Sequence, residues 1–342
     1  MLLMDGISVA DVVRDPEWLP HKFEEDDESL TFVHLPRVAR AELAFLYDQY
    51  FAGRFRKASF PVKQVAIELE AANQAPIHFI FHTSLCGSSL LARAFDLPNV
   101  ASAMREPAIG LTLAERVIRQ NDSANARRLE ILTSLLARPF SPREAVVVKQ
   151  SNFANRLAAP ILRCSDLSRA VLLYSDLETY LASLLKRGIW GRILGRKLFN
   201  NLNNWSSLKL DFNGVEMFEL TDMQVASLAW LMQIFHFDTL AKNFGDQTLL
   251  LNSNDFFASP GAELHEVFTF FDLEISKSAV ADIVAGPTFF KHSKSIDRQY
   301  NSDDRKRELL VVSDKNSEEI LMAVKWIEAY ASHHGLPLVP SA

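Results

Sequence analysis

The sequence predicts an α/β fold with a central parallel sheet of about five strands, helices on both faces and a helical C-terminal region. Two observations lead to this prediction. From about residue 76 onward, short continuous apolar runs alternate with longer segments of helical periodicity, as in proteins built from strand–helix–strand units. The chain is also long enough, at 342 residues of which 48% are hydrophobic, to bury a large core.

Each element can be placed along the chain. Residues 1–75 are expected to form an irregular, partly helical appendage to a domain that spans residues 76–342. Buried strands are predicted at 77–82, 99–104, 145–149, 170–174 and 248–251. Helices are predicted at 108–120, 124–137, 154–163, 177–187, 223–244, 262–271, 276–284 and 318–331. The polar stretch 289–304 is predicted to be a long loop. The basic stretch 186–209 is predicted to be an amphipathic helix that either lies on the surface or covers an anionic ligand.

The stretch 77–97 joins a strand, a tight polar loop and a helix, an arrangement that binds phosphate groups. Gly87 lets the backbone approach an anion closely, and Ser88 and Ser89 add hydroxyl donors. The triphosphatase pattern Gly-x-x-x-x-Gly-Lys-Ser/Thr is met only in part, because His82 and Ser88 stand at its first glycine and its lysine. We therefore expect a P-loop-type three-layer fold whose loop holds an anion without transferring a phosphoryl group from ATP. The alternative is an ordinary strand–helix turn capped by serine.

Composition narrows the class of protein. A net charge of −6 argues against broad nucleic-acid binding. The two cysteines, Cys86 and Cys164, are too few for a disulfide framework and fit a reducing compartment. No metal-ligand spacing, signal peptide or apolar stretch of about 18 residues is present. We expect a cytoplasmic protein without a metal, a nucleic-acid partner or a membrane partner; a homodimer is compatible with the sequence.

Polar residues follow four of the predicted strands. They are 82–89, Arg105 with Glu106, Lys149, and Ser175 with Asp176. Ligands of parallel sheets bind at the carboxyl ends of the strands, so these residues are expected to surround one site.

The motifs at these strand ends resemble those of the PAPS-dependent sulfotransferases, especially their divergent bacterial branch. These enzymes transfer a sulfuryl group from 3′-phosphoadenosine 5′-phosphosulfate (PAPS) to a hydroxyl or amine. Their phosphosulfate loop reads Pro-(Lys/Arg)-Ser-Gly-Thr-Thr-x-Leu, and residues 84–91 (Ser-Leu-Cys-Gly-Ser-Ser-Leu-Leu) have a similar spacing. Their 3′-phosphate motif, Arg-Asp-Pro-Arg-Asp-x-x-x-Ser, is similar to residues 175–183, where Asp176 and Ser183 match.

Two weaker similarities extend the resemblance over about residues 76–300. Residues 249–256, followed by a helix ending at 270–273, resemble the family's strand, helix and Phe-Leu-Gly-Leu-like turn. Lys149, after its valine-rich strand, is similar to the Lys-x-Pro motif of the carbohydrate sulfotransferases. The sequence also departs from the family, because Leu85 and Ser175 replace two basic residues. Nearby cations that could take over their charge are Lys149, Lys186, Arg187 and Lys294.

The resemblance implies PAPS as co-substrate, 3′,5′-bisphosphoadenosine (PAP) as product, and a small-molecule or carbohydrate acceptor. It implies that Lys149 stabilises charge on the bridging oxygen and that Glu106 is the general base, with His82 as the rival base. The phosphosulfate would be held by the loop residues Thr83, Ser84, Leu85, Cys86, Gly87, Ser88 and Ser89. The 3′-phosphate would be held by Ser175, Ser183 and Lys186, while Lys294 and Arg298 close over the donor.

Alternatives remain open at this stage. Glu106 could pair with Arg105 or cap the following helix, and His82 could make a structural hydrogen bond. The chain could be a non-catalytic nucleotide-binding protein on a degenerate sulfotransferase scaffold, which the replacements at Leu85 and Ser175 favour. It could also be a small-molecule kinase-like P-loop enzyme, although that reading needs Mg²⁺ and a lysine at the loop.

Overall fold

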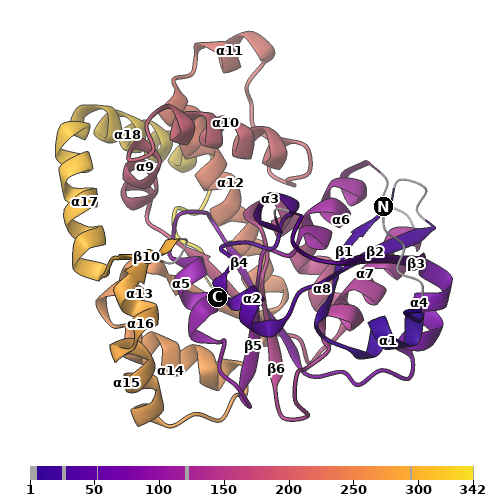
Figure 1. The fold of residues 1–342 in the computed structure, drawn as a ribbon. Helices are drawn as coiled ribbons and strands as arrows, with labels where there is room; N and C mark the ends of the chain where they lie inside the picture. Colours follow the sequence, from indigo (N-terminus) through magenta and orange to yellow (C-terminus); the bar gives the residue numbers. More distant parts are fainter. Residues whose placement is uncertain (1–5, 25–27, 52, 120–122, 293–294, 342) are drawn as a thin grey trace.

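The computed structural model has a five-stranded parallel sheet at its centre (Figure 1). It describes residues 6–24, 28–51, 53–119, 123–292 and 295–341, without the side chains of 117–119, 123, 292 and 295–298. The strands lie in the order β5-β6-β4-β7-β8, and every pairing is parallel. Their bounds are β4 (Ile77–His82), β5 (Ala101–Arg105), β6 (Ala145–Lys149), β7 (Ala170–Tyr174) and β8 (Thr248–Asn252). The predicted α/β class and the five predicted strands are confirmed.

Helices connect these strands and cover both faces of the sheet. In chain order they are α5 (Ser88–Ala94), α6 (Ala108–Arg119), α7 (Ser123–Leu136), η1 (Asn152–Leu157), α8 (Ala158–Cys164), α9 (Leu177–Leu185), α10 (Ile189–Asn203), α11 (Gly214–Glu219), α12 (Asp222–Asn243), η2 (Gly245–Gln247), α13 (Ser253–Ala258), α14 (Pro260–Phe270) and α15 (Lys277–Ala285). The basic stretch of the sequence forms α10, as predicted. Among the described residues, none of the helices combines the length and apolar character needed to cross a membrane.

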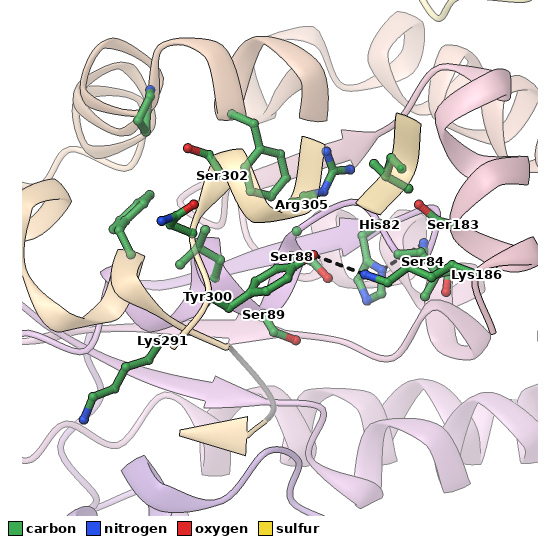
Figure 2. A pocket seen from close by; sticks show the side chains of 18 of the residues that line it. His82, Ser84, Ser88, Ser89, Ser183, Lys186, Lys291, Tyr300, Ser302 and Arg305 are labelled. Atoms are coloured by element: carbon green, nitrogen blue, oxygen red, sulfur yellow. Dashed lines mark hydrogen bonds between the residues drawn. The ribbon is translucent and has the colours of Figure 1, made fainter. Parts of the chain in front are cut away.

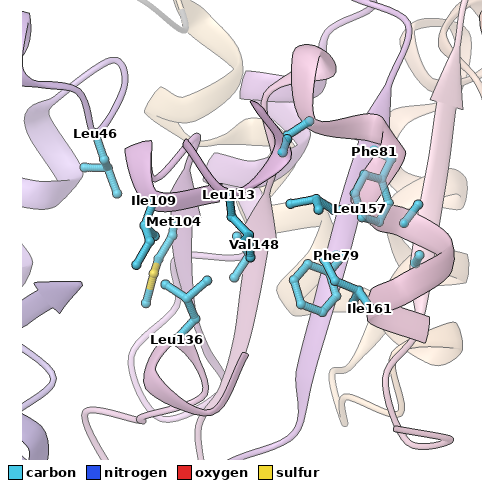
Figure 3. Packing of buried hydrophobic residues seen from close by; sticks show 14 of the residues in the cluster. Leu46, Phe79, Phe81, Met104, Ile109, Leu113, Leu136, Val148, Leu157 and Ile161 are labelled. Carbon is cyan, nitrogen blue, oxygen red and sulfur yellow. The ribbon is translucent and has the colours of Figure 1, made fainter. Parts of the chain in front are cut away.

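The two faces of the sheet bury alternate residues of each strand, as strand geometry requires. Phe79 and Phe81 of β4 pack on one face with apolar residues of α6 to α9 and α12, part of which Figure 3 shows. Ile80 points to the other face, where it joins residues of α5 and α13 to α15, such as Leu91 and Phe268. Both faces are therefore covered by helices, and a ligand site is restricted to the ends of the strands.

The N-terminal segment is only partly as predicted. It contains the expected helices, but also an antiparallel sheet of three strands, β1-β2-β3, that the sequence pattern does not predict. Buried residues such as Phe32 belong to the same apolar cluster as Phe79 of the central sheet. The elements are α1 (Val9–Arg14), β1 (Trp18–Phe23), β2 (Ser29–His34), α2 (Arg37–Glu42), α3 (Asp48–Phe51), β3 (Lys57–Pro61) and α4 (Val62–Leu69). The division of the chain at residue 76 stays a prediction.

The C-terminal region is helical, with one correction. The described part of the predicted loop at 289–304 instead contains the end of a short helix, two short antiparallel strands and the start of a longer helix. The elements are α16 (Pro287–Phe290), β9 (Lys291–His292), β10 (Ser295–Gln299), α17 (Ser302–Lys315) and α18 (Ser317–His334). Helix α17 begins with a capping box between Asn301 and Asp304 but buries no residue completely. Its apolar residues form one run, 309–312, of which Leu309 and Val312 pack against the core, so the sequence shows no regular apolar stripe.

Candidate functional site

A cavity of about 550 Å³ lies at the carboxyl edge of the central sheet (Figure 2). Its walls come from the residues that follow β4, β5 and β6, from the end of α9, and from the segment between α13 and α17. Parallel sheets bind ligands at this edge. The predicted location of the site is thus where the fold leaves room for a ligand.

The loop after β4 has an unusual backbone. Ser84, Leu85 and Gly87 all have positive φ angles, of 80°, 56° and 87°. For Ser84 and Leu85 this conformation costs about 1 kcal/mol or more each, so the surrounding structure must hold it in place. Glycine is needed at position 87 for two reasons: its φ angle is positive, and a Cβ there would lie 2.8 Å from the ring of Phe257. Successive backbone N–H groups in a turn conformation form anion-binding concavities, and this loop leads through the left-handed Gly87 into the start of α5.

His82 fixes the shape of this loop. Its Nδ1 accepts a hydrogen bond from the backbone N–H of Ser84 at 3.1 Å, and its Nε2 lies 3.1 Å from the carbonyl oxygen of Gln150. These partners assign a neutral ring that carries its proton on Nε2. His82 lines the cavity, but both ring nitrogens are occupied by backbone groups. This geometry favours the structural alternative for His82 over its role as a base.

Glu106, Lys149 and Tyr47 form a chain of polar contacts in the cavity wall. Nζ of Lys149, which is almost fully buried, donates to Oε1 of Glu106 and lies 5.2 Å from the ring centroid of Phe45. The hydroxyl of Tyr47 donates to Oε2 of the same carboxylate. Glu106 has a positive φ of 54°, and its N–H donates to the carbonyl of Lys149 at 2.7 Å. Two neighbouring strand ends thus hold an ion pair whose backbones are also joined.

The protonation state of Tyr47 in this set of contacts follows from its surroundings. Burial, and then the Glu106 carboxylate, raise the pKa of Tyr47 well above its usual value. Tyr47 therefore stays protonated and acts as a hydrogen-bond donor. Arg105 is not the partner of Glu106, because its guanidinium donates to the backbone carbonyls of Arg40, Ala41 and Leu43.

Lys186, at the end of α9, also lines the cavity and is held by residues of the C-terminal region. Its ammonium pairs with Glu308 of α17 and donates to the hydroxyl of Tyr300 at 3.2 Å, a bond drawn in Figure 2. Ser183 lies one turn earlier on α9 and also lines the cavity. The Ser183 hydroxyl and the Lys186 ammonium therefore belong to one face of α9, three residues apart, with the ammonium already engaged by Glu308 and Tyr300.

Arg305 is a cation of the cavity wall that no motif of the sequence singles out. It belongs to α17, and its guanidinium carbon lies 4.1 Å from the ring centroid of Phe257. Burial lowers the pKa of Arg305 from its usual value. Its Nη2 is buried and has no hydrogen-bond partner among the residues that the structure describes.

The structure brings together ten of the predicted site residues around the cavity and places three elsewhere. Those that line it are His82, Ser84, Leu85, Gly87, Ser88, Ser89, Glu106, Lys149, Ser183 and Lys186. Thr83 and Cys86 are buried within the loop. Ser175 is completely buried as well, and its carbonyl accepts the indole N–H of Trp230 at 2.8 Å. Lys294 and the side chain of Arg298 lie outside the described residues.

Tyr47, Phe45, Phe257, Tyr300 and Arg305 are the site residues that the sequence motifs missed. Tyr47 is separated from Glu106 by 59 positions in the chain, so no local pattern relates them. Tyr300 lies in the stretch 289–304 that the sequence predicts to be a loop, and Arg305 directly follows it.

Comparisons with known proteins give distant likenesses. No family model matches the sequence, and no curated protein matches it significantly. The solved sulfotransferase domain of the curacin biosynthetic pathway is 12% identical, with a TM-score of 0.42 over 72% of this chain and 98% of that one. Sulfotransferase STF9 from Mycobacterium avium is 8% identical, with a TM-score of 0.41 over 74% and 79%. A retinol dehydratase in complex with retinol and PAP is 14% identical, with a TM-score of 0.40 over 81% and 89%.

The identities and TM-scores mark the likeness as remote. The function of the site therefore has to be inferred from its own residues.

Proposed function

We propose that this protein is a sulfotransferase that moves a sulfuryl group from PAPS to a hydroxyl or amine of a small-molecule or carbohydrate acceptor. The observation that carries this proposal is that Lys149, at the end of β6, and Lys186, at the end of the helix that follows β7, line one cavity together with the strained loop after β4, the strand between them. Two separated cations suit a donor that carries negative charge at both its 5′ and its 3′ end.

Sulfuryl transfer needs in-line positioning, a neutralised leaving group and deprotonation of the acceptor, as phosphoryl transfer does. The hydroxyls of Ser88 and Ser89, both nearly buried, would hold the 5′-phosphosulfate against the loop. The acceptor oxygen or nitrogen forms a bond to sulfur while the bond from sulfur to the bridging oxygen breaks. Lys149 would stabilise the negative charge that develops on that oxygen.

Glu106 would take the proton that the acceptor loses. Both of its carboxylate oxygens are occupied, one by Lys149 and the other by Tyr47. An acceptor that enters the cavity must therefore replace one of these contacts to reach the base. When Lys149 turns toward the leaving oxygen, Oε1 of Glu106 becomes available to the acceptor. Stabilisation of the leaving group by Lys149 and deprotonation by Glu106 would thus be coupled through one ion pair. The scheme uses no metal ion.

The 3′-phosphate would lie at Ser183 and Lys186. Lys186 already pairs with Glu308, and a phosphate would replace this carboxylate as its anionic partner. The side chains of the pair are each about one third exposed, so the exchange takes place near solvent, where breaking an ion pair costs little.

The second candidate is a non-catalytic nucleotide-binding protein. It is favoured by Leu85, which gives the loop no charge, and by the burial of Ser175 away from the cavity. It shares the binding step with the first candidate and differs in turnover. Release of PAP from PAPS in the presence of a set of alcohols, phenols, amines and sugars separates the two.

The binding step is tested by thermal shift with PAP, with 5′-AMP, and with ATP plus Mg²⁺. A ligand at 100 times its dissociation constant adds about 2.7 kcal/mol to the free energy of unfolding. At roughly 2–4 °C per kcal/mol, the rise in Tm is easily measured. We expect stabilisation by PAP that exceeds that by 5′-AMP. Stabilisation by ATP with Mg²⁺ alone would instead identify a kinase-like enzyme, and no shift with any of these ligands would contradict nucleotide binding.

A further inference from the structure

The loop above which the 5′ end of the donor would lie contributes no positive charge. Leu85 stands where the resembled family has a lysine or arginine, and its apolar side chain packs against the core while it lines the cavity. The loop offers hydroxyl and amide donors only. A sulfate or phosphate group placed there would gain from a cation at short range, because charge-assisted hydrogen bonds are stronger than those from neutral donors.

Arg305 approaches this loop from α17. Its guanidinium lies over the ring of Phe257, and the same ring lies so close to Gly87 that a Cβ on this glycine would be 2.8 Å away. Phe257 is therefore in contact with the loop on one side and with Arg305 on the other. Figure 2 shows Arg305, Ser88 and Ser89 in the wall of the same cavity.

One nitrogen of the Arg305 guanidinium, Nη2, in the wall of the cavity, is buried without a hydrogen-bond partner among the described residues. Of the acidic residues near it on α17, Asp304 accepts from Arg307 and Glu308 pairs with Lys186, whereas the exposed Asp303 also lines the cavity. Buried guanidinium groups are nearly always paired, so Nη2 points to an anion that binds in the cavity. Stacking on Phe257 holds the group in one orientation before the ligand arrives.

We propose that Arg305 supplies, from α17, the positive charge that Leu85 does not, and that it contacts the phosphate or sulfate at the 5′ end of the nucleotide. This inference rests on the proposed function for the identity of the nucleotide. It assigns Arg305 a role in binding and positioning, and it makes α17 part of the anion site although the helix shows no motif.

The test measures dissociation constants by calorimetry for PAP, adenosine 3′-monophosphate and inorganic pyrophosphate. In Arg305→Ala we expect PAP and pyrophosphate to bind about 10- to 100-fold more weakly, the effect of losing hydrogen bonds to a charged group. Adenosine 3′-monophosphate should bind as it does to the unchanged protein, because it has no 5′ anion. Lys306→Ala removes the same charge from an exposed neighbour on α17 and should leave all three constants unchanged.

Relocation of the charge gives a second test. In the double variant Leu85→Lys with Arg305→Ala, the loop regains a cation, and PAP affinity should recover at least in part. Without ligand, Arg305→Ala should melt no lower than the unchanged protein, because the unpaired guanidinium contributes little to the fold. A lower Tm without ligand, together with failure of the double variant to recover binding, would assign Arg305 a structural role and overturn the inference.

The outcomes separate this inference from the proposed function. If the unchanged protein binds pyrophosphate through Arg305 but does not bind PAP, the proposed function fails while the anion site stands. If it binds PAP and Arg305→Ala binds PAP equally well, the inference fails and the proposed function stands. If the unchanged protein binds neither PAP nor pyrophosphate, both are wrong.

Discussion

Lys149 and Arg305 line the same cavity, yet the structure compensates their charges very differently. Lys149 pairs with Glu106 and lies against Phe45, whereas Arg305 has the ring of Phe257 and a buried nitrogen without a partner among the described residues. The strand-end side of the site is therefore electrostatically complete before a ligand binds. The side formed by α17 is incomplete. This difference matches the roles proposed for the two residues, Lys149 in the reaction step and Arg305 in binding the ligand.

The largest effect on stability is expected from breaking the compensated side. Lys149→Met leaves the Glu106 carboxylate in a largely buried position without its counter-ion. We expect the free energy of unfolding to fall by about 3 kcal/mol, as for other broken buried ion pairs. The double variant Lys149→Met with Glu106→Gln should recover most of this loss in urea denaturation, although both variants lose sulfuryl transfer. Equal stability of the single and double variants would contradict the pairing.

A buried histidine of the central sheet extends the comparison, because its ring remains uncharged instead of pairing with a counter-ion. His78 stacks on Phe271 at 4.6 Å, and burial lowers its pKa to about 4. The unfolded chain takes up this proton near pH 6.5 and the folded chain only near pH 4, so the stabilising contribution is complete above pH 6.5 and is lost as the pH falls toward 4. The shift corresponds to about 3 kcal/mol. His78→Phe should flatten the dependence of stability on pH in this window; an unchanged slope would show that His78 does not contribute.

Tyr47→Phe tests whether the N-terminal segment supports the site. The variant removes the donor to Oε2 of Glu106 and leaves the ring in place. Loss of a hydrogen bond to a charged group should lower the free energy of unfolding by about 1.5 kcal/mol. We also expect slower turnover with little change in PAP affinity, measured by steady-state kinetics and calorimetry. Tyr50→Phe, a ring neighbour of Tyr47, is the control, and equal effects of the two substitutions would refute a specific role.

The smallest effect on stability is expected at Lys186. Its ion pair with Glu308 is partly exposed, so Glu308→Gln should change the free energy of unfolding by about 0.5 kcal/mol or less. The same change releases Lys186 for the ligand and should tighten PAP binding several-fold, whereas Lys186→Met should weaken it. If Glu308→Gln weakened PAP binding, the proposed exchange of partners would be wrong.

The same division explains what the sequence could predict. Most strands of the central sheet are buried on both faces, whereas β8 is only partly buried; β6 and β7 appear as continuous apolar runs, and their predicted bounds are confirmed. Residues at the strand ends, including Glu106 and Lys149, were expected to meet because parallel strands end at one edge of the sheet. Local order was enough for both predictions.

The residues that come from outside this edge could not be predicted in the same way. Tyr47 reaches Glu106 from a segment whose three-stranded sheet gave no clear alternation, partly because β1 contains Pro20 and Lys22. Helix α17 buries no residue completely, and nothing in its sequence distinguishes Arg305 from an exposed arginine. Their roles depend on contacts between distant parts of the chain, which composition and spacing do not encode.

The central claim is that the cavity binds a nucleotide at both its 5′ and its 3′ phosphate. It is tested most directly by the ratio of the dissociation constants of PAP and 5′-AMP for the unchanged protein. Because Ser183 and Lys186 would contact only the 3′-phosphate, we predict that PAP binds at least about tenfold more tightly, the effect of one or two charge-assisted hydrogen bonds. Equal affinity for the two nucleotides would contradict the claim.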